Sequence, residues 1–193
     1  MFELKNYSLE DFIIKTQDKT SKPGGGAICA LTGALSASLM IMVDALSKNQ
    51  SLEDLDRVKN LCQNLQALIQ KDSEAFQGVL DAYKLPKETE EEKMHYQQAV
   101  EKGYHEAIKT PLEICQNILD LLKIQKEMKD KVHKYAMSDL KVAASLSYGA
   151  LEGAGFMVKT NLPGLGQEDQ RSYEKTLDKM LKEGLAIKKD LIK

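Results

Sequence analysis

The sequence predicts an all-α protein, a multihelical bundle with a central buried apolar helix. Across its 193 residues, no segment keeps the alternation of apolar and polar residues that is typical of a half-buried strand. Residues 28–46 instead form one apolar run, and a helix that is apolar on every side must be surrounded by protein or by lipid. Hydrophobic residues make up 42% and charged residues 29% of the chain, with no tryptophan, which is typical of long helices rather than of a β-sandwich.

The length is typical of one domain, residues 1–193, with a sizeable core. The net charge of -2 gives no field that attracts nucleic acid, so we expect no nucleic-acid partner. An odd number of well-spaced cysteines without a C-x-x-C pair favours a reduced, cytoplasmic protein; they are Cys29, Cys62 and Cys115. The histidines lack the spacing of metal ligands, so we expect no metal site; they are His95, His105 and His133.

The apolar run is near the length of a membrane-spanning helix, but polar residues interrupt it. Thr32, Ser36 and Asp44 lie within or close to its most apolar part, and the chain has no second run of this kind. We interpret the run as the central helix of a soluble bundle and expect no membrane partner. The first five residues are followed by polar residues rather than by the apolar stretch of a signal peptide.

Capping motifs and a proline mark the helix boundaries in the first half of the chain. The motif Ser-Leu-Glu-Asp at 8–11 opens a short helix, expected to run to about Lys19. The apolar helix spans about 27–47. A second such motif at 51–54 opens a helix expected to reach Tyr83, and Pro86 ends it because the residue before a proline is disfavoured in helical geometry.

Three further helices are expected in the second half of the chain. The first spans about 90–126 and should kink or break after Lys109, because Pro111 lies inside it. Ser138 is a good N-cap, with Asp139 in the first turn of a helix that runs to about Thr160. Residues 161–166 form a loop, and an amphipathic helix over 167–192 closes the fold.

The segment Pro23-Gly24-Gly25-Gly26 stands directly before the apolar helix. Backbone entropy and the missing proline amide oppose a helix or strand interior here, so the segment predicts a tight loop. The helix start that follows carries unpaired N–H groups and the positive end of the helix dipole, which suit an anion or the polar edge of a ligand. A plain turn before a core helix explains the same residues, and both interpretations stay open.

One carboxylate interrupts an otherwise apolar seam. Steps of three and four residues along the third helix reach Leu55, Val58, Cys62, Leu65, Ile69, Asp72, Phe76, Val79 and Tyr83. A carboxylate in the position of Asp72 loses hydration, which raises its pKa toward the range useful for proton transfer unless a cation offsets the effect. The alternative is a buried aspartate that is capped or paired and serves only the structure.

Basic residues gather in a connection near the middle of the chain: Lys123, Lys126, Lys129, Lys131, His133 and Lys134. Such a cluster is typical of a solvated connection. The functional interpretation is a salt-sensitive docking surface for an acidic tail or other carboxylates.

The glycine segment, the aspartate on the seam and the Ser-Asp helix start occur in this order in one known family. The chain resembles the cyclodeaminase domain of formiminotransferase-cyclodeaminase and the related stand-alone bacterial methenyltetrahydrofolate cyclohydrolases. The matching segments extend over essentially the whole chain and lie at 23–27, 72–76, 85–89 with 91–93, 110–112, 138–144 and 161–162.

This resemblance implies a compact all-helical homodimer that acts on a one-carbon-substituted tetrahydrofolate, including polyglutamylated forms, without a metal or redox cofactor. It assigns Asp72 as the proton donor and acceptor, with Asp139 as a second catalytic residue that orients it or holds the pterin. It also implies a substrate-binding set made up of Pro23, Gly24, Gly25, Gly26, Ser138 and Asn161.

The chain departs from the family pattern at two places. Tyr96 stands where family members tend to have an arginine, and Val132-His133 stands where they tend to have Gly-Asn. These changes leave open altered folate contacts, another substrate or a relative without the activity. The sequence does not choose between cyclisation of 5-formiminotetrahydrofolate with ammonia release and hydrolysis of 5,10-methenyltetrahydrofolate to 10-formyltetrahydrofolate. A non-catalytic folate-binding or helical assembly protein is the alternative.

Overall fold

The computed structural model describes residues 4–19, 22–47 and 55–193, and in these ranges all regular structure is helical. The all-α prediction is confirmed. The helices are α1 (Leu9–Thr16), α2 (Gly25–Leu46), α3 (Leu55–Ala75), α4 (Gln77–Ala82), α5 (Glu90–Met128), α6 (Met137–Asn161) and α7 (Gln167–Leu191), with short 3-10 turns η1 (Leu4–Asn6) and η2 (Leu162–Gly164).

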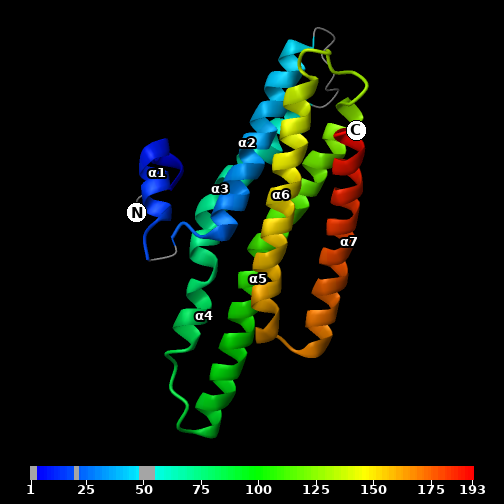
Figure 1. The fold of residues 1–193 in the computed structure, drawn as a ribbon. Coiled ribbons are helices and arrows are strands. Elements are labelled where there is room, and N and C mark those ends of the chain that lie inside the picture. Colours follow the sequence, from blue (N-terminus) through cyan, green and yellow to red (C-terminus); the bar gives the residue numbers. More distant parts are fainter. Residues whose placement is uncertain (1–3, 20–21, 48–54) are drawn as a thin grey trace.

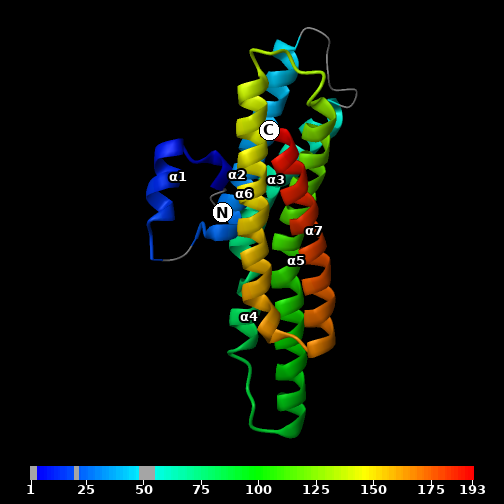
Figure 2. The same ribbon diagram turned by 45° about the vertical axis from the view of Figure 1, so that its right-hand side comes forward.

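The long helices lie along one another in an elongated bundle, and α1 stands at its side (Figures 1 and 2). The helix α5 is in contact with α2, α3, α4, α6 and α7, while α2 packs between α3 and α6. Hydrogen bonds fix the direction of α2 against α6, since Ser36 Oγ donates to the carbonyl of Ala143 at 2.8 Å. Near the C-terminal end of α2, the backbone N–H of His133 donates to Ser47 Oγ at 3.0 Å. The two helices therefore run antiparallel.

Small side chains on α2 let its neighbours approach closely. Ala27, Ala30 and Ala37 are fully buried. A Cβ at Gly33 would lie 3.0 Å from Cγ1 of Ile118 on α5, a tighter approach than most side chains allow. The expected central apolar helix is therefore present, with its inner face against α3, α5 and α6.

Part of the outer face of α2 is left exposed by the residues that the structure describes, although the sequence led us to expect burial on every side. Leu35, Met42 and Leu46 are 42% to 55% exposed. In the described ranges, α2 is the one helix whose length and hydropathy would suffice to cross a membrane, and half of its most apolar window is buried in the bundle. The inner side of this apolar helix is thus buried in the bundle, while Leu35, Met42 and Leu46 remain largely exposed.

Several predicted boundaries needed correction, while the first helix start is confirmed. Ser8 caps α1 by accepting the N–H of Asp11 at 3.0 Å, but the helix ends at Thr16 rather than near Lys19. The predicted helix to Tyr83 is interrupted at Phe76, which separates α3 from α4. The second capping motif, at 51–54, lies outside the described residues.

Later boundaries differ less. Thr89 forms a capping box with Glu92 and starts α5, which then continues unbroken through Pro111 to Met128. The helix α6 starts two residues earlier than predicted. Its N-cap position is Ala136, and Ser138 lies inside the first turn. The predicted closing helix is confirmed as α7.

Candidate functional site

A cleft of about 550 Å³ opens where the start of α2 meets the end of α3, α4, the middle of α5 and the end of α6. Its wall includes Gly24, Gly25 and Gly26 from the glycine segment and Asp72 and Phe76 from the α3–α4 junction. Pro23 is buried but is not part of this wall. The glycines and the seam aspartate, which are far apart in the sequence, thus line the same cleft.

The glycine at 26 is needed for space rather than for an unusual backbone conformation. No glycine in the described ranges has a positive φ, and Gly24 is the extended N-cap residue of α2. A Cβ at Gly26 would lie 2.5 Å from Cγ and 2.7 Å from Oδ2 of Asp72, which is overlap. The backbone of α2 therefore approaches the carboxyl group more closely than any residue with a side chain would permit.

The Asp72 carboxyl is partly desolvated and has no cationic partner in the described part of the chain. Burial raises its pKa above the ordinary aspartate value, and a hydrogen bond from the backbone N–H of Ala27 lowers it by a smaller amount. The adjacent Lys71 is committed elsewhere, with its Nζ 2.6 Å from Glu113 Oε2. Asp72 is thus a carboxyl group on the wall of a cleft that is easier to protonate than a free aspartate.

A thiol lies near this carboxyl, and a lysine lines the same cleft. Burial, together with the charge of Asp72, raises the pKa of Cys29 to about 11, so the thiol is neutral at pH 7. At the mouth of the cleft, Lys22 Nζ lies 3.4 Å from Gln77 Oε1. The cleft therefore combines an acid in its wall with a cation at its rim.

Asn161 lines the cleft and also explains why α5 does not break. Pro111 has no N–H to donate to the carbonyl four residues earlier, that of Ala107. The side-chain amide of Asn161 donates to this carbonyl at 3.3 Å and to the carbonyl of Met157 at 3.2 Å. Asn161 therefore supplies the hydrogen bond that proline cannot make and fixes the end of α6 against α5.

Ser138 and Asp139 do not reach this cleft within one chain. They lie in the first turn of α6, and Asn161 is the last residue of the same helix. With a rise of 1.5 Å per residue, the 22 steps from Asp139 to Asn161 cover about 33 Å. The candidate site residues thus form two groups at opposite ends of α6.

The two positions that depart from the family pattern have clear local contacts. Lys87 Nζ lies 3.9 Å from the centre of the Tyr96 ring, a cation–π contact, and Tyr96 packs against Tyr83 with ring centres 6.5 Å apart. At the other departure, the backbone of His133 binds the end of α2 as described above. Position 96 therefore still has a positive charge beside it.

Sequence reasoning missed an aromatic group beside the cleft. Phe76 makes an edge-to-face contact with Tyr104, with ring centres 6.4 Å apart, and Tyr104 shares a 2.7 Å hydroxyl hydrogen bond with Tyr83. Both Phe76 and Tyr83 were assigned to the buried seam, yet they are 41% and 45% exposed. The helix interruption at Phe76 changes the direction of the seam and exposes them.

Several known proteins resemble this chain over most of its length. The family model for formiminotransferase-cyclodeaminase matches residues 8–183. Methenyltetrahydrofolate cyclohydrolase of Methylorubrum extorquens is 32% identical, over 94% of this chain and 92% of the relative. Formimidoyltransferase-cyclodeaminase of Mus musculus is 30% identical over 82% of this chain, which spans only 31% of that longer protein.

A solved structure supports the fold. The crystal structure of formiminotetrahydrofolate cyclodeaminase from Thermotoga maritima aligns with a TM-score of 0.78 and 24% identity, covering 98% of this chain and 93% of that one. Together with the family match, which extends over most of the sequence, this shows that the chain belongs to the formiminotransferase-cyclodeaminase family.

Proposed function

We propose that this chain is an enzyme of one-carbon folate metabolism that acts on the methenyl or formimino bridge of tetrahydrofolate. The observation that carries the proposal is the partly desolvated Asp72 carboxyl beside the glycine start of α2, which has no cationic partner among the described residues. Hydrolysis of 5,10-methenyltetrahydrofolate is the first reaction to test, because the cyclohydrolase relative matches this chain over nearly its full length. Cyclodeamination is the second, because the cyclodeaminase relatives match over about four-fifths of this chain.

Both reactions need one group that takes and returns a proton. In hydrolysis, the Asp72 carboxylate accepts a proton from the water that adds to the methenyl carbon. The tetrahedral carbon then loses its hydroxyl proton to solvent as the bond to N5 breaks, and Asp72 returns its own proton to N5. In cyclodeamination, the formimino group reacts in its protonated form, C=NH2⁺. Asp72 takes the proton of N10 as that nitrogen attacks the formimino carbon, and gives it to the NH2 group, which leaves as ammonia while the methenyl bridge forms. General acid–base catalysis of this kind contributes about 10²–10⁴-fold.

The cleft offers further contacts for the substrate. Its volume of about 550 Å³ is in the range of small-molecule sites. The N–H of Ala27 is used by Asp72, so the preceding amides of Gly25 and Gly26 are available to a polar edge of the pterin. Lys22 at the mouth is placed to attract the glutamate carboxylates of the substrate, including a polyglutamate tail. The reaction as written needs no cofactor besides the folate.

We further propose a homodimer in which α6 packs antiparallel against the partner's α6. Gly149 has nothing within 4 Å of where its Cβ would lie, so another helix can approach closely there. Val142 and Phe156 are 49% and 59% exposed and lie seven residues before and after Gly149. A two-fold axis at Gly149 would pair each of them with the other on the partner, as an isologous interface requires.

The same axis would pair position 138 with position 160, because both are eleven residues from Gly149. Thr160 lines the cleft, so Ser138 and Asp139 of the partner subunit would arrive at its rim. This arrangement reconciles the family assignment of these residues with their distance from Asp72 in a single chain. The free cysteines agree with a reducing, cytoplasmic setting, which we also propose, for a single domain over residues 1–193.

A mixing experiment tests catalysis and dimer together. Asp72→Asn and Asp139→Asn, each expected to be inactive in spectrophotometric assays of methenyl-bridge formation and loss, are unfolded together and refolded as a mixture. Random pairing makes half of the dimers mixed, and each mixed dimer has one intact site, so activity should return to about one quarter of wild type. Full activity of Asp72→Asn would refute the catalytic role. Folate binding by calorimetry without turnover by wild type would favour the non-catalytic alternative.

If the mixture stays as inactive as its components, the shared site is wrong. A matched control mixes two samples of Asp72→Asn, for which no recovery is expected. Light scattering of Phe156→Glu gives a separate measurement of the dimer, since a buried charge at the interface should leave a folded monomer. A dimeric Phe156→Glu would place the interface elsewhere.

A further inference from the structure

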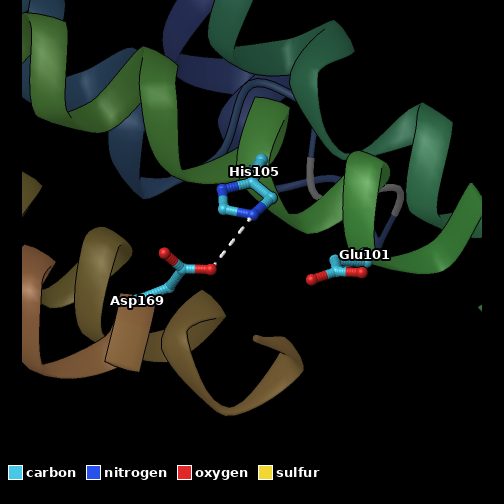
Figure 3. A group of neighbouring side chains, drawn as sticks. All are labelled: Glu101, His105 and Asp169. Carbon is cyan, nitrogen blue, oxygen red and sulfur yellow. Dashed lines mark ion pairs between the residues drawn. The ribbon is translucent and has the colours of Figure 1, made fainter. Parts of the chain in front are cut away.

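A second group of ionisable side chains lies on the other side of α5 from the cleft. Glu101 and His105 are four residues apart on α5, and Asp169 lies in the first turn of α7 (Figure 3). One ligand atom from each residue lies within 4.8 Å of the other two. Because i and i+4 residues share one face of a helix, the α5 pair is positioned by rigid backbone. The spacing of the histidines in the sequence gave no sign of this group, because its third member comes from another helix.

The distance between His105 and Asp169 suits a shared ion better than a direct hydrogen bond. His105 Nε2 lies 3.5 Å from Asp169 Oδ2, beyond the usual 2.7–3.2 Å of an N–H···O bond. Two ligands at about 2.1 Å from a tetrahedrally coordinated ion are about 3.4 Å apart. Figure 3 shows the Glu101 carboxylate on the same side of the imidazole, across the gap from Asp169.

A residue outside the group orients the imidazole. Tyr173, one turn further along α7, has its hydroxyl 3.3 Å from His105 Nδ1. This contact engages one ring nitrogen and leaves Nε2 facing the carboxylates. An outer partner on the second nitrogen is the usual arrangement for a histidine that binds a metal, because it fixes the tautomer and the ring direction.

The charges around this gap are not balanced by protein. Among the described residues, Glu101 forms no ion pair or hydrogen bond, and the ion partner of Asp169 is His105 alone. Two carboxylates thus face one imidazole across the gap. A bound cation would remove the repulsion between them.

We propose that Glu101, His105 and Asp169 form a binding site for a divalent first-row metal ion of the Zn²⁺ and Co²⁺ class. One imidazole with two carboxylates is a ligand set that such ions accept, whereas Ca²⁺ and Mg²⁺ prefer oxygen ligands alone. The side chains of His105 and Asp169 are 36% and 48% exposed, so the ion can enter from solvent and water completes its coordination. The site joins the first turn of α7 to α5.

This ion would act on stability and not in the proposed reaction. Ala107, which lines the folate cleft, is two residues from His105 and therefore faces a different side of α5. A ligand that binds the folded chain alone stabilises it by mass action. Zn²⁺ should therefore raise the melting temperature of the protein. It should take no part in the acid–base chemistry of Asp72.

The test is calorimetric titration of the chelator-treated, dialysed full-length chain with Zn²⁺, and separately with Co²⁺. We expect one ion per chain and a rise in melting temperature. His105→Ala and Asp169→Asn should abolish both effects. His95→Ala is the matched control, since His95 is exposed on the same helix and lies outside the group, and it should bind like wild type.

Tyr173→Phe tests the orientation of the imidazole. It removes only the hydroxyl on Nδ1 and should weaken Zn²⁺ binding about 10-fold. In NMR spectra of the imidazole nitrogens, Zn²⁺ should shift Nε2 of His105 and leave the His95 signals in place. Unchanged Zn²⁺ affinity in His105→Ala, or no binding by wild type, would overturn the proposal and leave the group as a histidine–carboxylate ion pair. Neither result bears on catalysis by Asp72.

Discussion

Replacing Gly26 with alanine should displace the Asp72 carboxyl and thereby remove most of the activity. The new Cβ would lie 2.5 Å from Cγ of Asp72, about 1 Å inside the 3.5–4.0 Å of normal carbon contacts, and 2.7 Å from Oδ2 of the same carboxyl group. Forced overlap of this size costs about 1–3 kcal/mol of stability. Because the carboxyl has to rotate away from the Ala27 N–H, kcat should fall about 10²–10⁴-fold, the contribution of a general acid–base.

A double-mutant cycle separates this effect from general damage at the start of α2. In an Asp72→Ala background the obstructing carboxyl is absent, so Gly26→Ala should cost almost no further stability in urea unfolding. Gly25→Ala is the neighbouring control, because its Cβ meets only the flexible Met157 side chain, at 3.2 Å from Sδ. Wild-type turnover by Gly26→Ala, or equal stability losses in both backgrounds, would refute the close approach.

Three further variants test the site and its surroundings. Burial raises the pKa of Asp72, so the native state loses stability relative to the unfolded chain as pH rises from about 3.9 through the higher native value. In urea unfolding, Asp72→Asn should therefore be more stable than wild type at about pH 7.5 but not at about pH 3.5. A stability difference that is the same at both pH values would contradict the desolvation of Asp72. Gly149→Leu should shift sedimentation from dimer to monomer without unfolding the chain, whereas an unaffected dimer would rule out a crossing at this glycine. Asn161→Ala should lower the free energy of unfolding by about 1–3 kcal/mol, because it leaves the Ala107 carbonyl without a donor. Adding Pro111→Ala to this variant should restore much of the lost free energy. If it does not, the missing proline amide is not the cause of the loss.

Patterns confined to single elements predicted the fold well. The apolar run 28–46, the serine cap at Ser8 and the closing amphipathic stretch each determine a helix through local periodicity and capping, and α1, α2 and α7 are present as expected. Errors arose where contacts from elsewhere decide the outcome. The chain continues helically through Pro111 because the Asn161 side chain, fifty residues later, satisfies the carbonyl that the proline leaves free.

The site was predictable in composition but not in geometry. Asp72 was identified because a single carboxylate among apolar seam residues is unusual. The glycines were identified because three in succession disfavour a helix or strand interior. That Gly26 faces Asp72 is a contact between α2 and α3, and helical periodicity gives no information on which residues of two helices meet. Phe76 and Tyr83 were assigned to the core because the seam was continued through the interruption at Phe76, although Gly78 stands two residues beyond it.

Ser138 and Asp139 show how element length constrains a site. A helix of 25 residues is rigid, so two sets of residues at its ends cannot meet within one chain, whatever their role in a family. If both sets serve one substrate, a second copy has to run in the opposite direction. The symmetric placement of Val142 and Phe156 about Gly149 supplies an apolar contact for such a copy at the spacing of two helical turns on either side.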